Sequence, residues 1–271
     1  MSNITIEKMR YEAAVLSRAG CEFHSEIDST NLRAKQIARQ GAKQGTAVFA
    51  ESQTAGRGRL SRSWMSESGR GIYMSYITRP ASLPAVRSPE LSFIAAIAVC
   101  DAFDAALENA RSPLRSGIKW PNDVILGGKK ACGILAETGL KPDGNVDWAV
   151  TGIGLNILGL DFPEELPWAT SLQAAGGFEA ERGEIALKLL DRLDHWTAIW
   201  AEQGFGPIRA ACKERMLTLG KRVRAERDGD SVTGYALDLG EDGSLLLQTD
   251  AGDILPMLFG EVSVRGMMGY I

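Results

Sequence analysis

Three arginines stand close together in the stretch ESQTAGRGRLSRSW, residues 51–64. The guanidinium groups of Arg57, Arg59 and Arg62 can each donate several hydrogen bonds to a phosphate or a carboxylate. The glycines between them let the backbone approach a ligand closely, because they carry no side chain. The stretch fits an anion clamp, a solvated loop or a nucleic-acid-binding arm, and taken alone it leaves these three alternatives open.

A second polar group lies in IKWPNDVILGGKKACGILAE, residues 118–137. Asn122 and Asp123 form a turn after a tryptophan and a proline, and a hairpin would return Lys130 and Gly133 close to them. Strict strand alternation places Lys130 and Gly133 on opposite faces of this strand. The lysine either serves a site here or extends its ammonium group from a strand edge into solvent.

A third feature is a row of small residues in TGIGLNIL, residues 151–158. Gly152, Gly154 and Asn156 alternate along one strand face, which leaves a bare strip on the sheet. Such a strip accommodates a flat ligand, or it marks a bulge or close packing of neighbouring groups. The sequence of this segment favours neither alternative.

Composition limits what these features can do. The 271-residue chain has a net charge of −4 and a pI near 5.4, so the arginines are a local feature of an acidic protein. The four cysteines form no CxxC pair and the two histidines are isolated, which predicts reduced thiols that are buried or half-exposed, and no zinc site. The charged N-terminus is unlike a signal peptide, and the longest apolar run, residues 91–100, is too short to span a bilayer. We expect a cytoplasmic protein without a membrane segment.

The elements that must position these groups follow from hydrophobic patterning. Residues 21–50 have a strand–helix–strand pattern, with Ser29 and Thr30 at the helix start. A core helix is predicted after Ser88 and a second one over residues 184–203, with a meander of short strands between residues 117 and 158. About five short strands follow Met216, which predicts a small barrel. The prediction is one α+β domain over residues 1–217 and a small all-β domain over residues 218–271.

Taken together, the motifs identify a family. From about Phe23 to its C-terminus the chain resembles the biotin protein ligases (biotin–acetyl-CoA-carboxylase ligases). The stretches that carry the resemblance are DSTN at residues 28–31, ESQTAGRGRLSRSW, KWPND at 119–123, KKACGILAE around Lys130, GIGLN at 152–156 and FGEVSVRG near the end. It implies a catalytic domain like that of class II aminoacyl-tRNA synthetases, with a mixed or antiparallel sheet and helices, and a C-terminal SH3-like barrel.

The resemblance also implies the reaction. Biotin and MgATP would form biotinyl-5′-AMP and pyrophosphate, and the biotinyl group would pass to a lysine of a biotin carboxyl carrier domain of acetyl-CoA carboxylase or a related carboxylase. The family suggests a homodimer. A carboxylate is already ionised at pH 7, so its attack on the α-phosphate needs no general base, and the task is to bring two anions together. No protein ligand for a metal is expected, since Mg²⁺ would be held through the phosphates of ATP.

Carried over residue by residue, the resemblance implies two overlapping subsites. Biotin would contact Ser29, Thr30, Asn31, Gln53, Arg57, Gly58, Arg59, Lys130, Gly133 and Gly154. ATP and the adenylate would contact Arg59, Arg62, Trp64, Asn122, Lys130, Asn156 and Trp168. The catalytic residues would be Arg57, Arg59, Lys130 and Asp123, with Asp123 orienting the acceptor lysine or accepting its proton. The arginine loop would close over the intermediate and protect it from water.

Two departures from the family pattern bear on function. Leu60 and Ser61 interrupt the usual run of arginines and glycine before Arg62, so one phosphate-facing charge is missing and weaker retention of the adenylate is expected. About twenty residues precede the catalytic core, so we expect no DNA-binding domain and no repressor role. A lipoate or octanoate ligase or transferase on the same fold is the alternative function, although no RRxSGG-like stretch occurs. A non-enzymatic nucleic-acid-binding module is the remote one.

Overall fold

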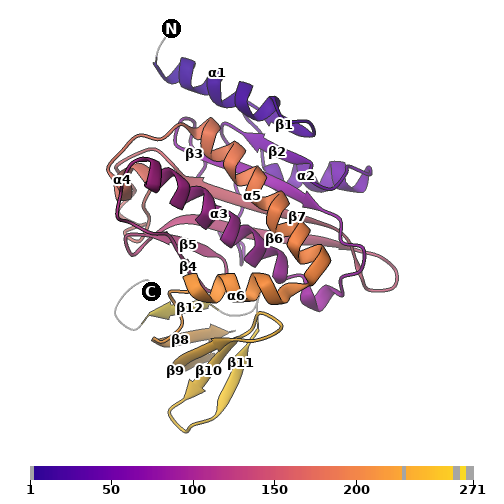
Figure 1. The fold of residues 1–271 in the computed structure, drawn as a ribbon, viewed down its shortest axis with the longest axis vertical. Helices are drawn as coiled ribbons and strands as arrows, with labels where there is room; N and C mark the ends of the chain where they lie inside the picture. Colours follow the sequence, from indigo (N-terminus) through magenta and orange to yellow (C-terminus); the bar gives the residue numbers. More distant parts are fainter. Residues whose placement is uncertain (1–2, 228–229, 259–262, 267–271) are drawn as a thin grey trace.

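A mixed seven-stranded sheet forms the centre of the larger part of the molecule (Figure 1). The computed structural model describes residues 3–227, 230–258 and 263–266. Along the sheet the strand order is β1-β2-β3-β7-β6-β5-β4, and β1 and β2 are parallel whereas the other neighbours are antiparallel. The strands are β1 (Cys21–His24), β2 (Ala47–Ala50), β3 (Gly71–Thr78), β4 (Gly117–Lys119), β5 (Asp123–Leu126), β6 (Lys129–Leu140) and β7 (Val146–Asn156).

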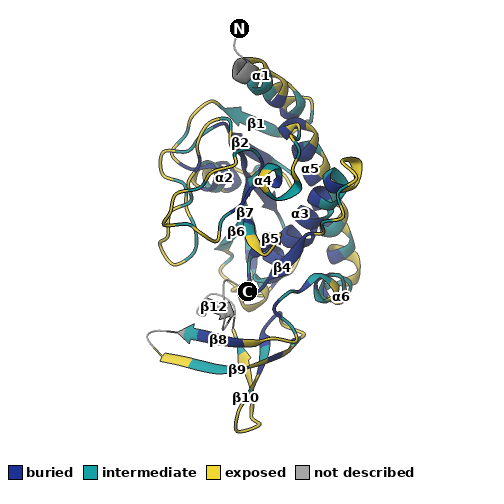
Figure 2. Cartoon of the chain, turned by 90° about the vertical axis from the view of Figure 1, so that its left-hand side faces the viewer, coloured by how far each residue is buried: buried dark blue, intermediate teal, exposed yellow. Residues whose placement is uncertain are grey.

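Helices cover both faces of this sheet, as Figure 2 shows, with α2 on one side and α3 and α5 on the other. Apolar residues of α3 and α5 join the main core, whereas α2 packs a smaller core against Val48, Ile77 and Trp148. β3 is buried along its whole length, because apolar groups pack on both sides of the sheet. The helices are α1 (Asn3–Leu16), α2 (Thr30–Arg39), α3 (Glu90–Asn109), α4 (Leu172–Gly176), α5 (Arg182–Gln203) and α6 (Phe205–Arg215), with a 3₁₀ turn η1 (Ala85–Arg87).

The C-terminal part forms a second, wholly antiparallel sheet that fits an SH3-like barrel. Its strand order is β11-β10-β9-β8-β12, and Figure 1 shows it next to α6. The strands are β8 (Arg222–Arg227), β9 (Asp230–Leu239), β10 (Leu245–Thr249), β11 (Ile254–Met257) and β12 (Ser263–Gly266). The predicted fold class, an α+β domain followed by a small β-barrel, is therefore confirmed.

Two further expectations concern thiols and membrane segments. Cys100, Cys132 and Cys212 are buried, Cys21 is half-buried, and all four thiols are free, as predicted. Among the residues that the structure describes, no helix has both the length and the apolar character that crossing a bilayer requires. Three α-helices, α1, α4 and α6, lie where the sequence patterns gave no prediction.

Candidate active site

A cavity of about 460 Å³ opens on the α2 face of the central sheet. The start of α2, the arginine loop, β5, β6 and β7 contribute its walls. Every residue that the sequence analysis placed in the two subsites or among the catalytic residues lines this one cavity: Ser29, Thr30, Asn31, Gln53, Arg57, Gly58, Arg59, Arg62, Trp64, Asn122, Asp123, Lys130, Gly133, Gly154, Asn156 and Trp168. Segments more than a hundred residues apart in the sequence thus meet in one place.

Hydroxyl and amide groups form one end of the cavity, at the start of α2. Ser29 is the N-cap residue, yet its side chain makes no capping hydrogen bond in the structure, so the helix end does not occupy its hydroxyl. The backbone N–H of Thr30 donates to Gln53 Oε1 at 2.9 Å, and Gln53 Nε2 donates to Ser66 Oγ at 2.8 Å. This end therefore offers neutral groups that can both donate and accept hydrogen bonds.

The arginine loop is a tight β-hairpin. Gly58 N donates to Arg62 O at 2.7 Å, and Arg62 N donates to Arg59 O at 3.1 Å across the turn. The two residues at its tip, Leu60 and Ser61, have φ values of 53° and 59°. Positive φ at both central positions is typical of a type I′ turn, which glycine and asparagine favour and other residues adopt with strain. The interruption of the family motif therefore lies at the most strained point of the loop.

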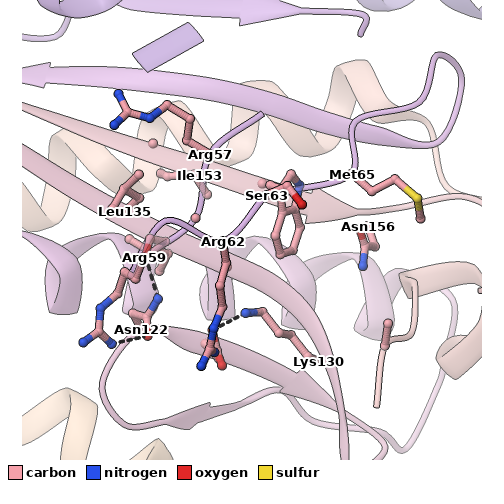
Figure 3. A pocket seen from close by; sticks show the side chains of 18 of the residues that line it. Arg57, Arg59, Arg62, Ser63, Met65, Asn122, Lys130, Leu135, Ile153 and Asn156 are labelled. Atoms are coloured by element: carbon pink, nitrogen blue, oxygen red, sulfur yellow. Dashed lines mark hydrogen bonds and ion pairs between the residues drawn. The ribbon is translucent and has the colours of Figure 1, made fainter. Parts of the chain in front are cut away.

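Cationic groups gather at the other end of the cavity, where Figure 3 shows Arg59, Arg62 and Lys130 near Asn122. Lys130 Nζ lies 2.6 Å from Asp123 Oδ1, and Arg59 Nη1 donates to Asn122 Oδ1 at 2.9 Å. Burial lowers the pKa of the Arg59 guanidinium, although the carboxylate of Asp123 partly offsets this effect. Two partly buried cations therefore interact with a single carboxylate, an arrangement that suits an anionic ligand.

The expected position of Lys130 on its strand was wrong. In the pairing of β5 with β6, Val124 faces Cys132 but Ile125 faces Lys130, so β6 contains one extra residue at this point. Such a bulge reverses the alternation. A Cβ placed on Gly133 would lie 3.3 Å from Lys130 Nζ, so the two residues share a face. The bulge turns the lysine into the cavity.

Side chains of the protein cover the glycine strip. A Cβ on Gly154 would lie 2.4 Å from Trp64 Nε1, and one on Gly152 would lie 2.1 Å from Asn31 Oδ1. The indole of Trp64 also lies next to Gly133, and Lys130 Nζ is 5.3 Å from the ring centroid. Close packing is therefore the reason for these glycines in this structure. Trp64 Nε1 is buried and has no hydrogen-bond partner among the described residues.

Arg57 differs from the other arginines, because it points away from Lys130 and Asn122 (Figure 3). Its side chain is 45% exposed, and Nη1 lies 3.6 Å from Oε1 of Glu137. The sequence analysis did not single out Glu137, which contacts Arg57 and Asn31 of the site, although it ends the quoted motif KKACGILAE. A carboxylate that closes an otherwise apolar strand segment was the available signal.

Comparison with known proteins agrees with this geometry. Two family models match, the biotin/lipoate A/B protein ligase family over residues 23–156 and the biotin protein ligase C-terminal domain over residues 218–265. The bifunctional ligase/repressor BirA of Bacillus subtilis is 36% identical over 233 residues, which cover 85% of this chain and 70% of that protein. The biotin–[acetyl-CoA-carboxylase] ligase of Mycobacterium tuberculosis is 36% identical over 241 residues, covering 85% and 86%.

Solved structures give the same result. The biotin protein ligase of Aquifex aeolicus in complex with biotin and ATP has a TM-score of 0.78 and 32% identity, covering 92% of this chain and 100% of that one. The extent of these matches, over both parts of the chain, shows that it belongs to the biotin protein ligases of the biotin/lipoate A/B protein ligase family.

Proposed function

We propose that this protein is an ATP-dependent biotin ligase, which converts biotin to biotinyl-5′-AMP and passes the biotinyl group to a lysine of a carrier domain. The observation that carries the proposal is the single cavity in which neutral hydroxyl and amide groups face one end and cations the other. This polarity matches biotin, whose ureido ring is neutral and whose carboxylate is charged. The related structure from Aquifex aeolicus holds biotin and ATP.

The first step is a displacement at phosphorus. A carboxylate oxygen of biotin attacks the α-phosphorus of ATP, the bond from that phosphorus to the bridging oxygen breaks, and pyrophosphate leaves with the electron pair. Lys130 and Arg59 reduce the repulsion between the two anions and stabilise the charge that develops. In a closed site each group of this kind contributes about 3–4 kcal/mol.

The second step is acyl transfer, and Asp123 is our candidate to assist it. In the structure Asp123 pairs with Lys130 at 2.6 Å, so an anionic ligand that takes the Lys130 ammonium releases the Asp123 carboxylate. We assign Asp123 the task of orienting the acceptor lysine and accepting its proton. The neutral amine then attacks the acyl carbon, and the bond from that carbon to AMP breaks.

In the proposed reaction Mg²⁺ would enter the site bound to the phosphates of ATP. Over the described residues, no group of three or more His, Cys, Asp or Glu side chains could hold a metal ion. The residues thus do not form a dedicated metal site, and no step of the proposal is assigned to the ion.

The name of the Mycobacterium tuberculosis relative identifies a carboxylase as its substrate, so we propose the biotin carrier domain of a carboxylase as the acceptor. The edge position of β1 in the sheet supports a homodimer formed through the sheet, and four free thiols suit the reducing cytoplasm. We place the domain boundary at residues 217/218, where the match to the C-terminal family model begins.

The test is a mass measurement on the acceptor. A carrier domain incubated with this protein, biotin and MgATP should gain the mass of one biotinyl group, and the protein should exchange pyrophosphate into ATP only when biotin is present. Absence of both signals would refute the proposal. Thermal stabilisation by lipoate but not by biotin would instead support the lipoate alternative.

A further inference from the structure

Glu137 lies on β6 next to Asn31, and three side chains converge on its carboxylate. Lys35 Nζ donates to Oε1 at 2.7 Å, Asn31 Nδ2 donates to Oε2 at 2.9 Å, and Arg57 Nη1 lies 3.6 Å from Oε1. Burial alone raises the pKa of Glu137, but the hydrogen bonds from Lys35 and Asn31 outweigh it and hold the pKa below its usual value. At neutral pH Glu137 is therefore ionised and can only accept hydrogen bonds.

An acceptor in this place determines the orientation of the Asn31 side-chain amide. Nδ2 must face Glu137, and its second hydrogen points towards Leu135 O at 3.4 Å. Oδ1 consequently faces Ser75 Oγ, 2.5 Å away. Asn31 is only 4% exposed, so the protein itself uses both polar ends of this side chain. The carboxylate of Glu137 on β6 therefore determines which end of the Asn31 amide faces Ser75 on β3.

The orientation of Asn31 then fixes the only proton of the Ser75 hydroxyl. Asn31 Oδ1 cannot donate, so Ser75 must donate to it. Ser75 is fully buried, and its Oγ also lies 2.8 Å from Thr30 Oγ1. With the Ser75 proton already committed, the Thr30 hydroxyl has to donate across this second contact, because otherwise two oxygen lone pairs would face each other at that distance.

Gln53 Oε1 is a second acceptor within reach of the Thr30 hydroxyl proton, at 3.2 Å from Thr30 Oγ1. The contact with Ser75 Oγ is shorter, at 2.8 Å, and Gln53 Oε1 already accepts the Thr30 backbone N–H at 2.9 Å, so the proton goes to Ser75. Since the Thr30 hydroxyl has used its proton on Ser75, it presents lone pairs to the cavity that it lines. A ligand group at this point must donate.

We propose that Glu137 is a specificity-determining positioning residue: acting through Asn31 and Ser75, it makes the Thr30 hydroxyl an acceptor towards the cavity, which selects an acyl substrate with an N–H group. The ureido ring of biotin has two such groups, whereas the dithiolane ring of lipoate has none. The carboxylate itself touches no substrate. The inference rests on the proposed function and adds to it the reason for substrate choice.

We call the hydrogen-bonded chain from Glu137 through Asn31 and Ser75 to Thr30 the relay. It is tested by calorimetric titration with biotin of the wild type and of three variants: Glu137→Gln, Ser75→Ala and the double variant. Glu137→Gln keeps the shape of the side chain but lets either end of the new amide face Asn31. Ser75→Ala removes the hydroxyl that links Asn31 to Thr30. Each single change should weaken biotin binding by about tenfold to a hundredfold. Both substitutions break the same relay, so their effects should not add. The double variant should bind biotin at most about twofold more weakly than whichever single variant binds it less tightly.

Further readouts separate this role from a general structural one. Desthiobiotin keeps the ureido ring and lacks the sulfur-containing ring, so it should lose the same factor as biotin. KM for biotin should rise, whereas KM for ATP and the rate of transfer from purified biotinyl-5′-AMP should stay within about twofold of wild type. Glu22→Gln is the matched control, because Glu22 also pairs with a basic residue of α2, Arg33 at 2.9 Å, outside the cavity.

The outcomes distinguish failure of the proposed function from failure of the role assigned to Glu137. If the wild type itself does not bind biotin, the proposed function fails. If the wild type binds and folded Glu137→Gln binds equally well, or if the two single effects multiply in the double variant, only the relay is refuted. Should Glu137→Gln fail to fold, Ser75→Ala decides alone, since it leaves the ion pairs of Glu137 in place, and unchanged biotin affinity in it would overturn the inference.

Discussion

At the residue scale, Lys130 reaches the cavity because β6 contains one extra residue. Without the bulge opposite Ile125, strand alternation would place the ammonium group on the face opposite Gly133. The motif predicts which lysine matters, but period-two alternation gives the wrong face. A bulge depends on how two strands pair, and this pairing is not visible in the pattern of one strand.

Replacing this lysine gives the first prediction. Lys130→Ala should lower the rate of biotin-dependent pyrophosphate exchange by about 10²–10³, because a charge facing the reacting anions is lost. Lys129→Ala is the matched control, because Lys129 is the adjacent lysine but is exposed and does not line the cavity. This variant should keep the wild-type rate. Circular dichroism and thermal melting should show that both variants are folded. Exchange at a near-normal rate in Lys130→Ala would remove this residue from the mechanism.

The second prediction concerns Ser61 at the tip of the arginine hairpin, where φ is 59°. Glycine adopts this conformation without strain, so Ser61→Gly should favour the hairpin by about 1 kcal/mol. The hairpin holds Arg59 at Asn122, so biotinyl-5′-AMP should dissociate about fivefold more slowly. Ser61→Ala keeps the strain and should behave as wild type. Equal dissociation rates in all three proteins, measured by stopped-flow fluorescence, would show that the tip does not limit release.

At the element scale, a buried ion network ties the arginine loop to α1. Glu51 begins the loop and also accepts hydrogen bonds from Ser68 Oγ at 2.9 Å and Gly69 N at 2.7 Å, where the loop returns. Arg182 Nη1 donates to Glu51 Oε2 at 3.0 Å, and its Nε donates to Glu7 Oε1 of α1 at 2.8 Å. The carboxylate of Glu51 thus joins both ends of the loop, and Arg182 connects them to the N-terminal helix.

The third prediction separates this network from surface ion pairs. Arg182 is fully buried, so Arg182→Met would leave the carboxylate of Glu51 buried without its counter-charge and should reduce the free energy of unfolding by about 3–5 kcal/mol. Arg10→Met removes an exposed pair with Glu181, whose side chains are 67% and 54% exposed, and should cost less than about 1 kcal/mol. Urea unfolding measures both values. Similar losses in the two variants would contradict a special role for the buried network.

The same elements show what the sequence could and could not predict. Helices α3 and α5 and the strands around residues 117–158 follow from apolar spacing, since burial and periodicity are linked. The candidate site residues were found through motifs and line one cavity, and their roles stay predictions. Arg182, Glu51 and Glu7 were not found, because a charged residue reads as exposed until its partners, up to 175 positions away, are known.

At the scale of the whole molecule, Trp120 joins the C-terminal barrel to the active site. This buried side chain precedes the turn with Asn122 and Asp123, and its Nε1 donates to Gly243 O at 3.0 Å while its backbone N–H donates to Thr218 Oγ1 at 2.9 Å. The barrel therefore supports the segment that carries the proposed acyl-transfer residue. A displacement of the barrel at Gly243 should therefore shift the position of Asp123.

The fourth prediction uses two glycines of the barrel with similar backbone conformations. Gly243 has φ of 83° and Gly252 has φ of 90°, so alanine should strain the backbone at both by about 1 kcal/mol. An added Cβ at Gly243 would lie 2.7 Å from Phe93 Cε2 in α3, whereas nothing lies within 4 Å of one at Gly252. Gly243→Ala should therefore push the barrel from the catalytic part and slow carrier biotinylation at least about tenfold, while Gly252→Ala should keep the wild-type rate. Equal rates in the two variants, measured at matched fractions of folded protein, would mean that the barrel and the active site are not mechanically coupled through Trp120.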